Sequence, residues 1–201
     1  MAMTIDDIAR ILDKMEFKYR RHDDTSIAFF MTMDVFVDPD SSQKSLLLIA
    51  QLLEDGEYFQ MYAPAAFRVK GAHQDAFLRA CAMIQWRTKL IQFEWDETDG
   101  EVRPVIEFPL EDGRITLKQF RRCVGGMVSL MDQYYPVLKR AAEEGVVAME
   151  PSRPTASDDG LLDRIKAAAG GDLPDEALAR RLEELAEELR RARSDGAPTE
   201  L

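Results

Sequence analysis

The stretch from residue 91 to residue 110 constrains the fold more than any other part of the sequence. Apolar and polar residues alternate over 91–95, a Thr-Asp-Gly turn follows at 98–100, and the alternation resumes over 102–110. A period of two on both sides of a short turn predicts an antiparallel β-hairpin. Pro104 has no N–H for a ladder, so we expect the returning strand at a sheet edge or at a bulge.

An antiparallel meander is expected upstream of this hairpin. Residues 17–21 and 27–37 are rich in aromatic and β-branched side chains and predict strands. Residues 46–53 form a nearly continuous apolar run, which is typical of a strand buried on both faces. The turn residues at 54–57 lead into a further strand over 58–63.

Three segments carry the period of a helix. Apolar residues recur on one face over 4–15 and over 74–86, and a longer helix opens at Thr116 and ends near Gly145. Gly125-Gly126 lies inside the long helix, although glycine weakens a helix. We therefore expect the pair to permit close helix packing or a kink. The order of elements predicts an α+β fold, in which helices pack on an antiparallel sheet made of a three-stranded meander and the hairpin.

The composition changes near residue 148, which divides the chain into three parts. We expect a folded domain over 1–148, a flexible linker with room for a short helix over 149–172, and an amphipathic tail helix with a disordered end over 173–201. In the tail helix, leucines follow the four-three spacing of a short coiled-coil seam. These leucines are Leu178, Leu182, Leu185 and Leu189.

The overall charge excludes several classes of partner. The chain has 26 basic and 37 acidic side chains and a formal net charge of -11, so it repels nucleic acid and anionic lipid surfaces. No apolar run is long enough to span a membrane, and the N-terminus does not have the pattern of a signal peptide. We therefore expect a cytoplasmic protein that binds neither nucleic acid nor membrane.

The sequence contains little that predicts catalysis. His22 and His73 are isolated, Cys81 and Cys123 lie among apolar neighbours, and no glycine-rich phosphate loop is present. We expect no enzyme activity and no cofactor. The alternative is a metal-dependent hydrolytic enzyme that uses the carboxylates around the hairpin turn, although acidic residues are also common in solvated turns.

Three short motifs resemble a known family. They are Phe17-Lys-Tyr, Met83-Ile-Gln-Trp-Arg-Thr-Lys-Leu and the hairpin motif Phe93-Glu-Trp-Asp…Asp99-Gly-Glu-Val-Arg. With the order of elements over about 4–142, they resemble the YbjN family, also called bacterial sensory transduction regulators, and the fold of type III secretion chaperones. The resemblance implies a protein-binding or regulatory module that is frequently paired with itself, and it implies no catalytic residues.

A protein or peptide partner is therefore the leading expectation, together with a homodimer. Thioether side chains adapt to varied apolar partners, although methionines in strands also fill cores. The apolar second helix next to an edge strand could form a self-complementary contact. The candidate partner-binding residues are Met31, Met33, Met61, Phe77, Ile84, Trp86, Leu182 and Leu185.

Overall fold

The computed structural model describes residues 2–149 of the chain. The tail helix predicted over 173–201 lies outside the described residues, as does all of the predicted linker except residue 149. The domain boundaries expected at 148 and 172 therefore stay predictions.

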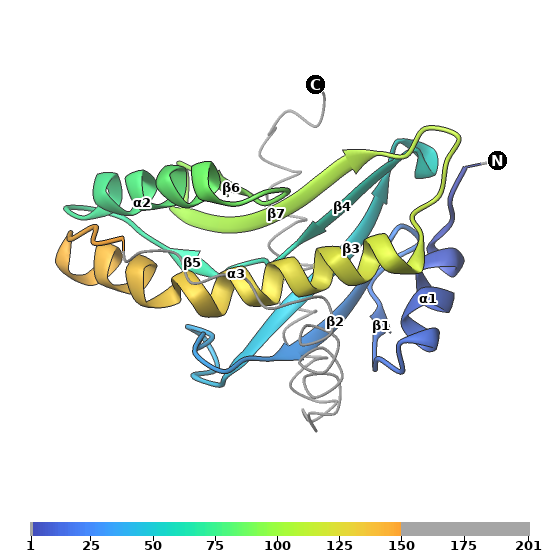
Figure 1. Cartoon of the computed structure of the whole chain (residues 1–201), viewed down its shortest axis with the longest axis horizontal. Helices are drawn as coiled ribbons and strands as arrows, with labels where there is room; N and C mark the ends of the chain where they lie inside the picture. The colour runs from blue at the N-terminus through green and yellow to red at the C-terminus, as the bar shows by residue number, and fades with distance from the viewer. Residues whose placement is uncertain (1, 150–201) are drawn as a thin grey trace. The chain divides into compact units, whose positions relative to one another are not determined.

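A single antiparallel sheet of seven strands forms the centre of the described domain (Figure 1). Its order is β1-β2-β3-β4-β7-β5, and β6 pairs with the opposite side of β7. The meander and the hairpin belong to one sheet because β4 pairs with β7. The strands are β1 (Arg20–Arg21), β2 (Ser26–Thr32), β3 (Ser45–Leu53), β4 (Tyr58–Tyr62), β5 (Phe67–Arg68), β6 (Gln92–Trp95) and β7 (Glu101–Pro109).

The three predicted helices are confirmed close to their expected ends. They are α1 (Ile5–Lys14), α2 (Gln74–Arg87) and α3 (Leu117–Glu144), and a short 3-10 turn, η1 (Glu54–Gly56), joins β3 to β4. The Asp7 carboxylate accepts hydrogen bonds from the backbone N–H and the hydroxyl of Thr4 at the start of α1, both at 3.0 Å. Gly145 ends α3 with a left-handed φ of 70°, a conformation that favours glycine.

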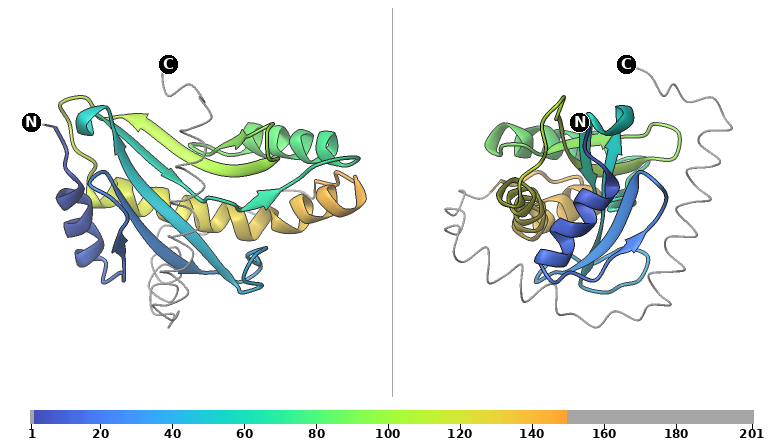
Figure 2. Two further views of the ribbon diagram at one scale, coloured as in Figure 1. Left: turned by 180° about the vertical axis from the view of Figure 1, so that it is seen from behind. Right: turned by 90° about the vertical axis from the view of Figure 1, so that its right-hand side faces the viewer.

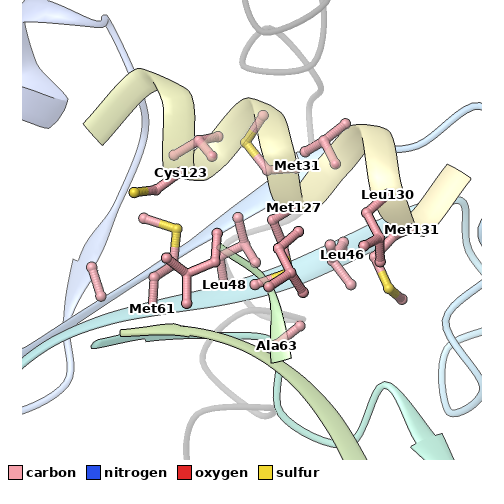
Figure 3. Close-up of a cluster of buried hydrophobic side chains, with 14 of the residues drawn as sticks. Met31, Leu46, Leu48, Met61, Ala63, Cys123, Met127, Leu130 and Met131 are labelled. Atoms are coloured by element: carbon pink, nitrogen blue, oxygen red, sulfur yellow. The ribbon is translucent and has the colours of Figure 1, made fainter. Parts of the chain in front are cut away.

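The helices cover one face of the sheet, and the hydrophobic core lies between them and that face. Residues from α1, α2 and α3 join alternate residues of the strands in one cluster of buried side chains. The views in Figure 2 show the helices on the same side of the sheet. Phe120 of α3 packs between Phe29 and Phe59, with ring centroids 6.2 and 6.1 Å away. Figure 3 shows the adjoining aliphatic and thioether part of this core beneath α3.

The prediction of one long strand over 27–37 is wrong after Thr32. The backbone N–H groups of Val35 and Phe36 donate to the buried carboxylate of Asp132, at 2.8 and 3.0 Å, and that of Asp34 donates at 3.2 Å. Three donors that point at a helix side chain cannot also pair with a neighbouring strand. Asp132 therefore bends the chain out of the sheet.

The sheet-edge position expected for Pro104 is wrong, because β7 pairs with strands on both sides. On one side the pairing is interrupted at this residue, where residues 63–66 lie between the partners of Val105 and Val102. The Pro104 carbonyl accepts a hydrogen bond from the backbone N–H of Ala63 at 3.1 Å. In an antiparallel strand the nitrogen of a residue points to the same side as its carbonyl. The Pro104 nitrogen therefore faces residues 63–66, the connection between β4 and β5, where no strand residue requires a donor.

Substitution by alanine should change the free energy of unfolding in opposite directions at two glycines. A Cβ at Gly56 would lie 2.0 Å from the Met3 carbonyl oxygen, and its φ is +94°, whereas a Cβ at Gly126 would meet nothing within 4 Å. Gly126 therefore shows no close helix packing of the kind expected. We expect Gly56→Ala to lower the free energy of unfolding by more than about 1 kcal/mol, and Gly126→Ala to raise it by about 0.5–1 kcal/mol. Urea unfolding measures both, and effects of the same sign would contradict this packing.

Removing the Asp132 carboxylate should destabilise the domain. Asp132→Ala leaves three N–H groups at residues 34–36 without their acceptor, at a cost of about 2 kcal/mol or more. Asp132→Asn keeps one acceptor oxygen and should fall between the alanine variant and the parent. Urea unfolding gives the free energies, and amide exchange should become faster at residues 34–36. Equal stability of Asp132→Ala and the parent would rule out this role.

Candidate protein-binding surface

A group of large apolar side chains is exposed at the carboxyl end of α2. Trp86 is 90% exposed, Leu90 53% and Met83 36%. Met83 and Trp86 lie one helical turn apart, and Leu90 follows in the connection to β6. We call these three residues the Trp86 surface. A group of exposed apolar side chains with polar neighbours is a candidate site for binding another protein.

Local hydrogen bonds fix the end of α2 that carries the Trp86 surface. The Thr88 hydroxyl donates to the Ile84 carbonyl at 3.0 Å, and the Gln85 side-chain oxygen accepts from the backbone N–H of Phe93 at 3.2 Å. The second bond ties α2 to the outer edge of β6. Figure 1 shows α2 beside β6 and above the far end of α3. The opposite side of α2 is buried, with Phe77, Ala80, Cys81 and Ile84 in the core.

Leu90 adopts a backbone conformation that is unusual for its side chain. Its φ is 73°, in the left-handed region, which costs a residue other than glycine about 1–2 kcal/mol. The strained residue is also an exposed leucine in the connection between two elements. Six other described residues that are not glycine also have a positive φ, so it is the exposure of its side chain that makes Leu90 a candidate contact residue.

Charged residues of both signs are exposed on α2 and in the β6–β7 hairpin. Arg79, Arg87 and Lys89 are exposed on α2 and just after it, whereas Asp96, Glu97 and Asp99 are exposed in the turn of the β6–β7 hairpin. Trp95 at the end of β6 is 41% exposed.

The structure places most of the predicted partner-binding residues in the core. Met31, Met61, Phe77 and Ile84 are 0% exposed, and Met33 is 2% exposed. A partner cannot contact these side chains unless the domain opens, so the interpretation that methionines fill the core describes them better. Figure 3 shows Met31 and Met61 packed beneath α3. Of the described candidates only Trp86 is accessible, and Leu182 and Leu185 lie outside the described residues.

The sequence interpretation missed three accessible residues, Met83, Leu90 and Trp95. Met83 precedes Trp86 by three residues in α2, so the two side chains lie on the same side of the helix. The helical spacing could therefore have predicted Met83 together with Trp86. Trp95 is in phase with Ile91 and Phe93 in the alternating pattern of the hairpin, and those two residues lie in or against the core. It stays exposed because it ends the strand. The backbone conformation of Leu90 has no signal in the sequence.

The cysteines and carboxylates that could support catalysis are engaged otherwise. Burial raises the pKa of the Cys81 thiol to about 12 and that of the Cys123 thiol to about 11, so both are protonated and unreactive near neutral pH. In the hairpin turn, Asp96 accepts from the backbone and hydroxyl of Thr98 at 2.7 and 2.6 Å. Within residues 2–149 no group of three or more histidine, cysteine or acidic residues could hold a metal ion.

Three more hairpin carboxylates have internal partners. Glu94 pairs with Arg103 at 2.7 Å, Asp99 accepts from the Glu101 backbone at 2.8 Å, and Glu101 accepts from the Ala65 backbone at 2.7 Å. Each carboxylate therefore stabilises the sheet or a turn. No observation in the described domain favours the hydrolytic alternative.

No protein-family model matches the sequence, and no curated protein matches it. The resemblance to the YbjN family therefore stays a hypothesis. In the described part of the chain, no helix combines the length and the apolar character that crossing a membrane requires.

Replacing Leu90 should separate backbone strain from the exposed side chain. Leu90→Ala and Leu90→Asn both remove the leucine, but asparagine tolerates the left-handed conformation better. We expect Leu90→Asn to have a free energy of unfolding about 0.5–1 kcal/mol above that of Leu90→Ala. Thermal or urea unfolding of the two variants measures the difference. Equal stabilities would show that Leu90 is not strained in solution.

Proposed function

We propose that this domain is a non-enzymatic protein-binding module that acts as a chaperone-like adaptor or as a regulator of the YbjN type. The observation that carries the proposal is the Trp86 surface, where a tryptophan is 90% exposed on a helix whose other side is buried. Tryptophan is the residue type most enriched among the energetically dominant contacts of protein interfaces. Its exposure costs solvation free energy that a bound polypeptide would recover.

Exposed charges of both signs on α2 and in the neighbouring hairpin support self-association. The cations lie on α2 and just after it, and the carboxylates lie in the hairpin turn that follows Trp95. In a two-fold symmetric dimer each partner presents the same patch, so the cations of one copy can face the carboxylates of the other. We therefore propose a homodimer through the Trp86 surface. We also propose a cytoplasmic location, on the basis of the acidic composition.

Self-association should depend on Trp86. We expect light scattering of the parent to report about twice the 22.9 kDa of one chain at micromolar concentration, and Trp86→Asp to report the mass of one chain, because it places a charge at the centre of the interface. Val146→Asp is a matched control, since Val146 is 40% exposed elsewhere. A parent that is monomeric at all concentrations would contradict the homodimer.

Partner binding should depend on the same residue. In affinity capture from a native lysate, we expect a specific protein to be retained by the parent and by Val146→Asp and lost with Trp86→Asp. Circular dichroism of each bait confirms that the variant is folded. If all three baits retain the same proteins, the Trp86 surface is not the binding site and the proposed function loses its main support.

A further inference from the structure

The outward side of α2 carries a regular stripe of residues. Ala76, Arg79, Met83 and Trp86 follow one another at intervals of three, four and three, which is the spacing of the seam between two packed helices. The stripe lies opposite the buried side of the helix. Three of its residues are exposed, and Ala76 is half-buried. We call these four residues the α2 seam.

The two ends of the α2 seam differ in size and in charge. Trp86 ends the seam with the largest side chain and is 90% exposed, whereas Ala76 begins it with a single methyl group. Arg79 is one turn after Ala76, and no residue of the described domain forms an ion pair with its guanidinium. An arginine binds best to the face of an indole ring. One end of the seam is therefore complementary to the other.

These two ends cannot meet within one copy of the helix. The rise of an α-helix places Ala76 and Trp86 about 15 Å apart along the axis, and Arg79 and Trp86 about 10 Å apart. A second copy of α2 that runs antiparallel to the first brings its amino end beside the carboxyl end of the first. The α2 seam is therefore complementary to a second copy of itself.

We propose that α2 packs antiparallel against α2 of a second copy, so that Trp86 of each copy lies on Ala76 and beneath Arg79 of the other. This inference rests on the homodimer of the proposed function and specifies its contact. Side chains lean toward the amino end of their helix, so Arg79 and Trp86 of opposite copies lean toward each other. The pairing is two-fold symmetric, and each contact occurs twice.

Disulfide formation between two single variants tests this register. In the proposed pairing, residue 79 of one copy lies opposite residue 83 of the other, and cysteines with Cα atoms within about 7 Å can be bridged. An equimolar mixture of Arg79→Cys and Met83→Cys should therefore form a cross-linked dimer on the order of tenfold faster than either variant alone. The natural Cys81 and Cys123 are buried and should not contribute.

Ala82→Cys is the matched control for this experiment. Ala82 precedes Met83 by one residue and is also exposed, but its side chain is turned by about 100° around the helix. A mixture of Arg79→Cys and Ala82→Cys should cross-link no faster than Arg79→Cys alone. Circular dichroism of each variant checks that the chain is folded.

The contact between Arg79 and Trp86 can be tested through the stability of the dimer. Because each dimer contains this contact twice, Arg79→Ala should raise the dissociation constant on the order of tenfold. Arg20→Ala removes the same charge from β1, an exposed strand at the other edge of the sheet, and should leave the constant unchanged. Analytical ultracentrifugation of the full-length chains measures both.

Two results would overturn this pairing. Equal cross-linking rates for the Met83→Cys and Ala82→Cys mixtures would mean that residues 79 and 83 do not face each other. Equal dissociation constants for the parent and Arg79→Ala would mean that no cation covers the indole. If either result is found while Trp86→Asp still abolishes the dimer, the proposed homodimer stands and the register is wrong. A monomeric parent would contradict both.

Discussion

The packing of every described helix on one face of a single sheet is the constraint on which the rest of this structure depends. α3 runs along that face and brings Phe120 between Phe29 and Phe59, so these three rings pack in one layer between helix and sheet. α2 packs on α3 and β6 at the far end, which leaves its outer side without a neighbour among the described residues. One-sided packing thus leaves Trp86 exposed on the outer side of α2.

The elements that could be predicted from sequence are those with strong local periodicity. The hairpin over 91–110, the three helices and the double burial of β3 follow from side-chain alternation, helical spacing and an unbroken apolar run. The end of β2 could not be predicted, because it depends on Asp132, a residue about 100 positions away. Pro104 was placed wrongly for a similar reason, since only the tertiary arrangement sets the gap between β4 and β5 opposite its nitrogen.

The binding residues were harder to predict, because residue type does not distinguish an inward from an outward side chain. Met31 and Met61 in strands could have lined a groove, but α3 covers the face they share. Ile84 and Trp86 are two positions apart on one helix and point in different directions. The function that we propose depends on this difference. The side chains that the helices leave exposed are available to a partner. Most of the residues that were predicted from their chemistry are buried in the core instead.

The environment of Trp86 is the most direct test of this account. The chain has two tryptophans, so Trp95→Phe leaves Trp86 as the single indole fluorophore. At the lowest workable concentration the account predicts emission typical of indole in water and unhindered quenching by acrylamide. Emission should shift to shorter wavelength as dimers form. Short-wavelength emission and protection from acrylamide in the dilute monomer would contradict the account, because Trp86 would then be buried within its own chain.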